Sequence, residues 1–132
     1  MLRLAQRFID EMVAHAREEL PNECCGIIAG RDGAAVELFR ARNAEASPYR
    51  YEVDSQDLFR IWRQCETNGW DFLVVYHSHV ASEAVPSQTD VRRATWPDAH
   101  YVVVSLADPD TPAVRAFRII EGNVSEEQIE VA

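Results

Sequence analysis

Residues 77–90 have the sequence His-Ser-His-Val-Ala-Ser-Glu-Ala-Val-Pro-Ser-Gln-Thr-Asp, directly after the apolar block Phe72-Leu73-Val74-Val75-Tyr76. A short, continuous run of β-branched and aromatic residues is typical of a strand that is buried on both faces. If this strand continues through His79, its period of two places His77 and His79 on the same side. The stretch therefore predicts a strand that ends in two neighbouring imidazoles.

An acidic residue follows this pair at a fixed distance. The chain turns away through Val80–Pro86 and returns with Ser87-Gln88-Thr89-Asp90, in which Ser87 is a candidate helix N-cap and Asp90 falls in the first turn. The Asp90 carboxylate can then face back towards the strand end. Two histidines and one aspartate give a tetrahedral Zn²⁺ three protein ligands and leave its fourth position to water, as in catalytic zinc sites. We therefore predict that His77, His79 and Asp90 bind one Zn²⁺ per chain.

Each part of this pattern also has another interpretation. Ser-x-x-Asp before a helical run is an ordinary capping signature, and a His-x-His pair at a strand end can serve packing or hydrogen bonding. A cupin-like metal-binding protein is a further alternative, because His77-x-His79-x-x-x-Glu83 fits the spacing of the cupin metal motif. The glycines expected to flank that motif are absent, since positions 71 and 90 are both Asp.

The spacing His-x-His, seven residues, Ser-x-x-Asp resembles the signature of the JAMM (MPN-plus) metallopeptidases, and every defining position is present. The family also has an upstream glutamate, for which this sequence offers Glu23. The resemblance covers essentially the whole chain, and it is strongest to small bacterial members that process ubiquitin-like sulfur-carrier proteins. It implies an MPN/JAB domain of mixed α/β class, with a curved, mostly antiparallel mixed sheet flanked by helices in a cytidine-deaminase-like architecture. Relatives that serve as non-catalytic scaffolds lack the His pair or the acid, which this chain retains.

Amide hydrolysis also needs a base, an oxyanion donor and a proton for the leaving amine. Neither metal-bound histidine can be the base, because its lone pair is on the metal, so a separate carboxylate is required. The resemblance supplies Glu23 for this role, whereas the sequence alone leaves Glu83 as a rival. Ser87 matches the family serine whose hydroxyl binds the developing oxyanion.

The resemblance implies a substrate class as well. The expected activity is zinc-dependent hydrolysis of the amide bond after the C-terminal Gly-Gly of a ubiquitin-like sulfur carrier, which releases cysteine or a short extension. The alternative is an isopeptidase that removes ubiquitin-like modifiers from lysines. An extended, glycine-rich tail would dock as an added strand beside an exposed sheet edge.

Composition sets the broad class. With 132 residues and 47% apolar content, the chain fits a single domain over residues 1–132. The net charge of −9 argues against a nucleic-acid binder, and no stretch is long and apolar enough for a membrane span. Of the three cysteines, Cys24 and Cys25 are adjacent, which favours a reducing cytoplasm over a disulfide framework. We interpret Cys25 as a small buried apolar residue.

Apolar periodicity and turn residues predict the remaining elements. His15 is expected at the surface or partly packed on the first helix, Cys25 is expected to share a strand face with Glu23, and His100 is assigned a structural role. The expected elements are a short edge strand over Leu2-Arg3-Leu4, a helix to about Leu20, strands over Glu23–Ala29 and Ala34–Arg42 joined at Asp32-Gly33, an extended segment over Tyr49–Val53, helices from Asp54 or Ser55 to Gly69 and over Ser87–Trp96, strands over His100–Ser105 and Ala113–Ile120, and a C-terminal strand that ends near Val131.

Overall fold

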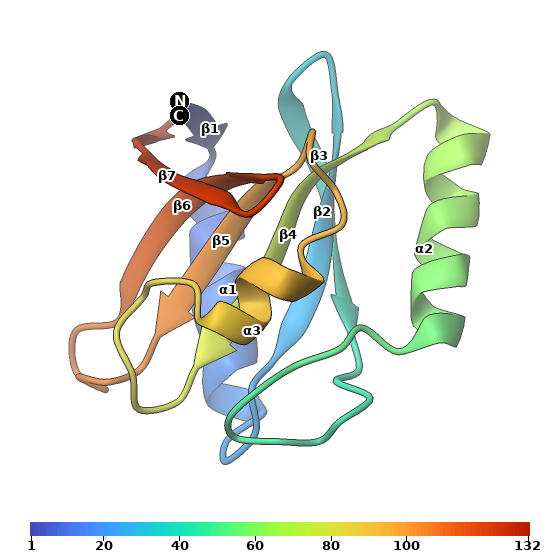
Figure 1. The fold of residues 1–132 in the computed structure, drawn as a ribbon. Helices are drawn as coiled ribbons and strands as arrows, with labels where there is room; N and C mark the ends of the chain where they lie inside the picture. The colour runs from blue at the N-terminus through green and yellow to red at the C-terminus, as the bar shows by residue number, and fades with distance from the viewer.

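The computed structural model describes residues 1–132 and has a six-stranded mixed sheet at its centre (Figure 1). The strand order is β3-β2-β4-β5-β6-β7, and only the central β4–β5 pair is parallel. The predicted fold class, a mostly antiparallel mixed sheet flanked by helices, is confirmed. The strands of this sheet are β2 (Cys25–Arg31), β3 (Ala34–Ala41), β4 (Asp71–His79), β5 (His100–Ser105), β6 (Ala113–Ile120) and β7 (Asn123–Glu127).

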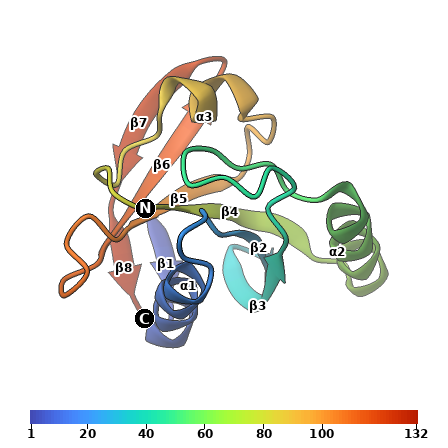
Figure 2. The same cartoon turned by 90° about the horizontal axis from the view of Figure 1, so that it is seen from below.

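Helices cover both faces of the sheet, as the view from below shows (Figure 2). Helix α1 (Gln6–Glu18) lies on one face, and α2 (Ser55–Asn68) and α3 (Gln88–Arg93) lie on the other. A separate parallel pair, β1 (Leu2–Leu4) with β8 (Ile129–Val131), lies beside α1 and places the first and last strands of the chain side by side. No helix combines the length and the apolar character that crossing a bilayer requires.

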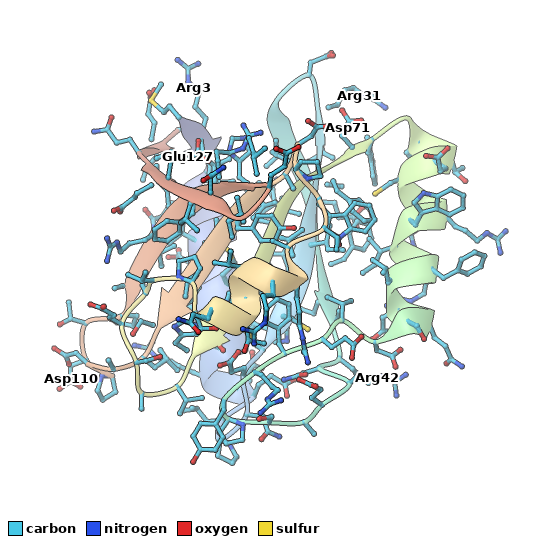
Figure 3. All side chains as sticks on the ribbon, in the orientation of Figure 1. Arg3, Arg31, Arg42, Asp71, Asp110 and Glu127 are labelled. Carbon is cyan, nitrogen blue, oxygen red and sulfur yellow. The ribbon has the colours of Figure 1, made fainter.

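Strand β4 connects the core to the candidate site. Val74 and Tyr76 pack into the cluster under α1, whereas Val75 packs into a cluster on the opposite face, where α3 lies. The strand continues through His79, as predicted, so the alternation carries both histidines to the α3 face. The chain direction puts them at the end of the sheet where Arg42 lies, whereas Asp71 and Arg31 mark the other end (Figure 3).

The hairpin predicted between the second and third strands is confirmed. Asp32 and Gly33 both have positive φ, at 51° and 79°, which is the backbone of a type I′ turn. This turn matches the right-handed twist of β2 and β3, and it pairs them from Cys25 with Ala41 to Arg31 with Ala34.

The prediction that His15 lies at the surface or is only partly packed is wrong. Its side chain is 2% exposed, and its Nδ1 lies 2.7 Å from the Tyr76 hydroxyl. Tyr76 is itself fully buried under α1, so its hydroxyl requires a polar partner inside the core. Periodicity along α1 could not show this, because the partner lies sixty-one residues away.

Three predicted boundaries are also wrong. Strand β2 begins at Cys25, so Glu23 lies before the strand and the two residues do not share a strand face. Helix α3 ends at Arg93 instead of Trp96, because Ala94 is already extended, with φ −73° and ψ 106°. The C-terminal segment forms two strands, β7 and β8, which belong to different sheets.

Candidate active site

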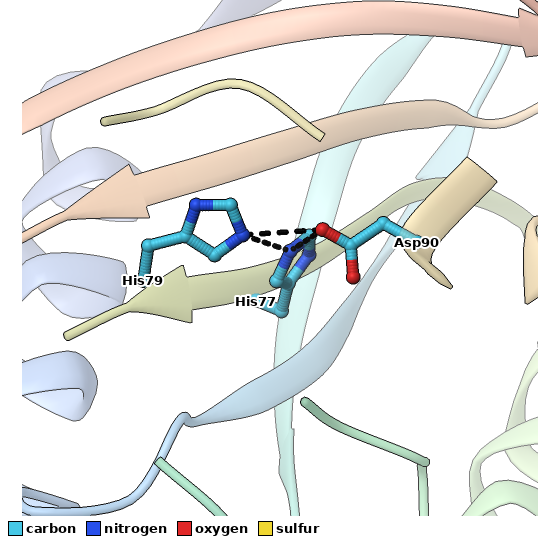
Figure 4. A group of neighbouring side chains, drawn as sticks. All are labelled: His77, His79 and Asp90. Carbon is cyan, nitrogen blue, oxygen red and sulfur yellow. Dashed lines mark hydrogen bonds and ion pairs between the residues drawn. The ribbon is translucent and has the colours of Figure 1, made fainter. Parts of the chain in front are cut away.

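Three predicted ligand residues meet at the end of β4. The Nε2 atoms of His77 and His79 lie 3.2 Å apart, and the Asp90 Oδ2 lies 2.9 Å from the first and 3.1 Å from the second (Figure 4). All three side chains are buried. The histidines come from β4 and the aspartate from the first turn of α3, so the strand end and the helix start jointly form the cluster.

This cluster has the dimensions that a metal ion requires. Zinc–ligand bonds of about 2.0–2.1 Å in a tetrahedron separate the ligand atoms by about 3.3 Å. The three observed separations, 2.9–3.2 Å, are slightly shorter than this edge length. Two imidazole nitrogens and a carboxylate oxygen are also a donor set that zinc accepts. The residues present therefore fit a metal ion.

The pKa values of the three groups reflect burial and mutual contact. Burial lowers the pKa of His77, which favours the neutral imidazole that binds metals. Burial also acts to lower the pKa of His79, but hydrogen bonds with Asp90 and with the Glu83 carbonyl outweigh it and raise this pKa. Burial acts to raise the pKa of Asp90, but its contacts with both histidines hold this pKa well below its ordinary value. The aspartate is therefore a carboxylate.

Two contacts around the cluster orient the histidine rings. His79 Nδ1 donates to the backbone carbonyl of Glu83 at 2.7 Å, which turns the Nε2 lone pair of His79 towards His77 and Asp90. The ring of Tyr51 stacks on His77, with centroids 4.3 Å apart and planes at 18°. His77 Nδ1 has no hydrogen-bond partner, so this ring is held by its contact with Asp90 at Nε2 and by packing against Tyr51.

Glu23 is 3% exposed, and its Oε1 has no hydrogen-bond partner. Burial raises the pKa of this carboxyl to about 8, with smaller opposing contributions from His79, which lowers it, and Asp90, which raises it. The residue lines a cleft of about 470 Å³ together with His79 and Ser87. The structure thus brings Glu23 close to His79, although the two are more than fifty positions apart in the sequence.

Ser87 caps α3 in a reciprocal arrangement with Asp90. Its Oγ accepts from the Asp90 backbone N–H at 3.1 Å, and its own N–H donates to Asp90 Oδ2 at 2.9 Å. A hydroxyl that accepts one hydrogen bond still has its own proton to donate. The capping role therefore leaves the Ser87 proton available to a group in the cleft.

Glu83, the rival base and cupin-type ligand, is not part of this cluster. Only His77, His79 and Asp90 come together as possible metal ligands, and the exposed Glu83 side chain lines a different hollow. The sheet is open, with helices on both faces, and is no barrel. Glu83 contributes its backbone carbonyl instead, a role that no residue type in the sequence signals.

The cysteines are free and buried, and burial raises the pKa of Cys24 to about 12 and of Cys25 further still. Protonated, buried thiols are weak nucleophiles and weak ligands. The structure agrees with the interpretation of Cys25 as a small apolar residue.

Fold and site together define the chain as a hydrolase of the JAMM type. The family described as prokaryotic homologs of the JAB domain matches residues 5–120, and the chain belongs to this family. It is 46% identical over 125 residues to the CysO-cysteine peptidase of Mycobacterium tuberculosis, an alignment that covers 93% of this chain and 86% of the relative. It is 37% identical over 111 residues to the desampylase of Haloferax volcanii, with 79% and 80% covered.

Solved structures agree on the fold. The solution structure of a protein from Desulfitobacterium hafniense matches with a TM-score of 0.89 at 36% identity, over 100% of this chain and 93% of that one. A structure described as "JAMM: A Metalloprotease-like Zinc Site in the Proteasome and Signalosome" matches with a TM-score of 0.61 over 100% and 98%. Its identity of 16% supports the fold alone.

Proposed function

We propose that this protein is a zinc peptidase that cleaves after the C-terminal Gly-Gly of a ubiquitin-like sulfur-carrier protein and releases cysteine or a short extension. The observation that carries the proposal is one cleft in which the buried Glu23 carboxyl and the Ser87 hydroxyl, with its proton still to donate, adjoin the cluster of His77, His79 and Asp90. The peptidase named for CysO-cysteine, 46% identical to this chain, supports the substrate class.

His77, His79 and Asp90 would hold the zinc ion, one per chain. When bound, Zn²⁺ lowers the pKa of a water ligand to about 7 and polarises a carbonyl oxygen as a Lewis acid. The hydrogen bond from His79 to the Glu83 carbonyl and the stacking of Tyr51 on His77 keep both rings in place for this role.

Glu23 is the proposed general base. Its Oε1 has no partner, so it is free to accept a proton from the attacking water and to deliver it to the leaving amine. A carboxyl with a pKa of about 8 would be protonated at neutral pH. A divalent cation beside it favours the charged form and lowers this pKa, so the metal site and the base are electrostatically linked.

Ser87 is the proposed oxyanion donor. Its Oγ accepts the Asp90 N–H, which directs the hydroxyl proton away from the helix. A donor of this kind typically contributes about 2.7–4 kcal/mol of transition-state stabilisation.

The cleft suits a linear tail. Most of its other lining residues are small or rigid, with Pro21, Pro48, Ala81 and Ser82 among them; Tyr49 is the one large side chain, and Glu23 is the only acidic residue. A few tail residues bury too little surface to bind well alone, so the folded body of the carrier would contribute most of the affinity.

Mass spectrometry of a Gly-Gly-Cys carrier incubated with the zinc-loaded protein tests the proposal. We expect loss of the terminal cysteine with no other cleavage, and no loss with the His79→Ala variant. A carrier that stays intact would overturn the assignment.

The isopeptidase is the second candidate, favoured by the 37% identity to the Haloferax desampylase. Efficient cleavage of lysine-linked ubiquitin-like conjugates, with the linear carrier left intact, would establish it in place of the first.

A further inference from the structure

No hydrogen bond at Oε1 fixes the position of the Glu23 carboxyl, and the residue lies outside regular secondary structure. Its position therefore depends on its backbone. The Glu23 N–H donates to the Ser47 carbonyl at 2.9 Å, and the next amide, of Cys24, donates to Ser78 Oγ at 2.8 Å. Between these two bonds, the Glu23 carbonyl accepts from the side chain of Asn43 at 3.1 Å.

Asn43 uses all of its hydrogen-bonding capacity. Its Nδ2 donates to the carbonyls of Glu23 and Arg50, at 3.1 and 3.0 Å, and its Oδ1 accepts from the backbone N–H groups of Glu45 and Glu52, both at 3.1 Å. Two carbonyls on one end and two amides on the other determine which end carries the nitrogen. One side chain thus connects the Glu23 backbone to the start of the 43–53 loop, at Glu45, and to its end, at Arg50 and Glu52.

The same loop carries the aromatic ring that orients a ligand. Tyr51 lies between Arg50 and Glu52, whose backbone groups both bond to Asn43, and its ring stacks on His77. Asn43 is therefore connected on one side to the proposed base and on the other to the ring that packs against a metal-binding histidine.

We infer that Asn43 is a positioning residue. Through its bonds to the Glu23 carbonyl and to the backbone of residues 50–52, it fixes the position of Glu23 relative to the His77 ring. The inference rests on the proposed function for the role of Glu23 as the base. Small displacements of a catalytic group are costly, since about 1 Å can lower the rate by about 10². Asn43 touches neither the reacting atoms nor the metal ligands, so its effect is on geometry.

The test is Asn43→Asp in the zinc-loaded protein. Aspartate keeps the acceptor for Glu45 and Glu52 but replaces the donor to Glu23 and Arg50 with an oxygen that repels both carbonyls. The link to the base is therefore broken, while the two bonds to the Glu45 and Glu52 amides are kept. We expect kcat on the Gly-Gly-Cys carrier to fall roughly 10- to 100-fold, with KM within about twofold and zinc content unchanged. The matched control is Asn68→Asp, whose amide donates only within exposed α2, to the Gln64 carbonyl.

A kcat equal to that of the control, or a change in KM alone, would overturn the inference. Amide hydrogen exchange gives a second readout that needs neither substrate nor a folded variant. In the wild-type protein the Glu45 and Glu52 amides should exchange at least tenfold more slowly than in an unstructured chain, and exchange at the unstructured rate would overturn the network. If the wild-type protein failed to cleave the carrier, the proposed function would be wrong, while hydrogen exchange would still decide the role of Asn43 in the loop.

Discussion

At the scale of single residues, the Glu23 carboxyl is the group whose environment is most demanding. It is buried, unpartnered at Oε1 and close enough to Asp90 to be disfavoured as a carboxylate. A buried, unpaired acid costs stability when it ionises, and such groups concentrate at functional sites. On the proposed mechanism, a nearby cation would favour the charged form of Glu23 and offset this loss of stability.

The first prediction concerns pH and the metal-free protein. The Glu23 pKa is about 8 in the folded chain and has the ordinary value of 4.5 in the unfolded one. Between these values the unfolded state binds fewer protons, so the free energy of unfolding falls as pH rises, and the stability present below 4.5 is lost by about 8. We expect Glu23→Gln to gain several degrees in melting temperature over the wild type at pH 9 and nothing at pH 4.

Melting curves of chelator-treated protein across this range would measure the difference. The exposed Glu66→Gln variant on α2 serves as control. Parallel profiles for wild type and Glu23→Gln would contradict the raised pKa.

The second prediction concerns turnover. Glutamine at position 23 keeps the shape of the side chain but cannot accept the proton, so we expect kcat to fall by about 10²–10⁴. Zinc content and fold should persist, because Glu23 is not among the cluster residues. Steady-state kinetics and elemental analysis check both, and a dead Glu83→Gln beside an active Glu23→Gln would reverse the assignment of the base.

At the scale of elements, the sequence predicts that His77, His79 and Asp90 come together, because all three lie within fourteen residues. A strand period of two and a helix first turn are local rules, and they placed His77, His79 and Asp90 together. The position of Glu23 beside this cluster cannot be predicted in the same way. It depends on the segment before β2, which Asn43 and Ser78 hold through hydrogen bonds between residues far apart in the sequence. No local pattern encodes these bonds, so only the family resemblance pointed to Glu23.

The third prediction separates the two roles of Ser87. Glycine is tolerated at an N-cap, so Ser87→Gly should cost only a few tenths of a kcal/mol, whereas Ser87→Ala should cost about 0.5–2 kcal/mol. Both variants lose the hydroxyl, and on the proposed mechanism both should lose about 10²–10³ in kcat. Urea unfolding and kinetics on the two variants give the comparison. Activity that tracked stability instead of the hydroxyl would reduce Ser87 to a capping residue.

The fourth prediction concerns the contact between β2 and β4. Gly26 pairs with Tyr76 across the two strands, and a Cβ at position 26 would lie 2.5 Å from the Tyr76 Cζ, well inside van der Waals contact. The ring cannot move, since it is buried and bonded to His15. We expect Gly26→Ala to lose about 3 kcal/mol or more. Tyr76→Phe removes the hydroxyl and leaves the buried His15 Nδ1 without its partner, so it should lose about 1–3 kcal/mol. Equal urea midpoints for Gly26→Ala and wild type would contradict the packing.

At the scale of the whole molecule, apolar patterning predicted most strands and helices, but it did not give their pairing. The parallel β4–β5 pair and the joining of β1 to β8 connect segments that no periodicity relates. The burial of His15 could not be predicted for the same reason, because its hydrogen-bond partner, Tyr76, is on a strand distant in the sequence. The architecture matters for function because the segment before β2, the end of β4, the start of α3 and the 43–53 loop reach the site from different parts of the chain.

The last prediction follows from that convergence. A metal held by β4 and α3 together binds only the folded state, so zinc should stabilise the protein, by about 2.7 kcal/mol when free zinc is 100 times its dissociation constant. Chelation should lower the melting temperature and abolish cleavage, and added zinc should restore both.

His79→Ala should lose the metal, whereas His100→Ala should retain it, because His100 pairs with Glu127 at the far end of β5. Elemental analysis should find one zinc per wild-type chain; iron or manganese that persisted in Asp90→Ala would instead favour a cupin-like metal protein.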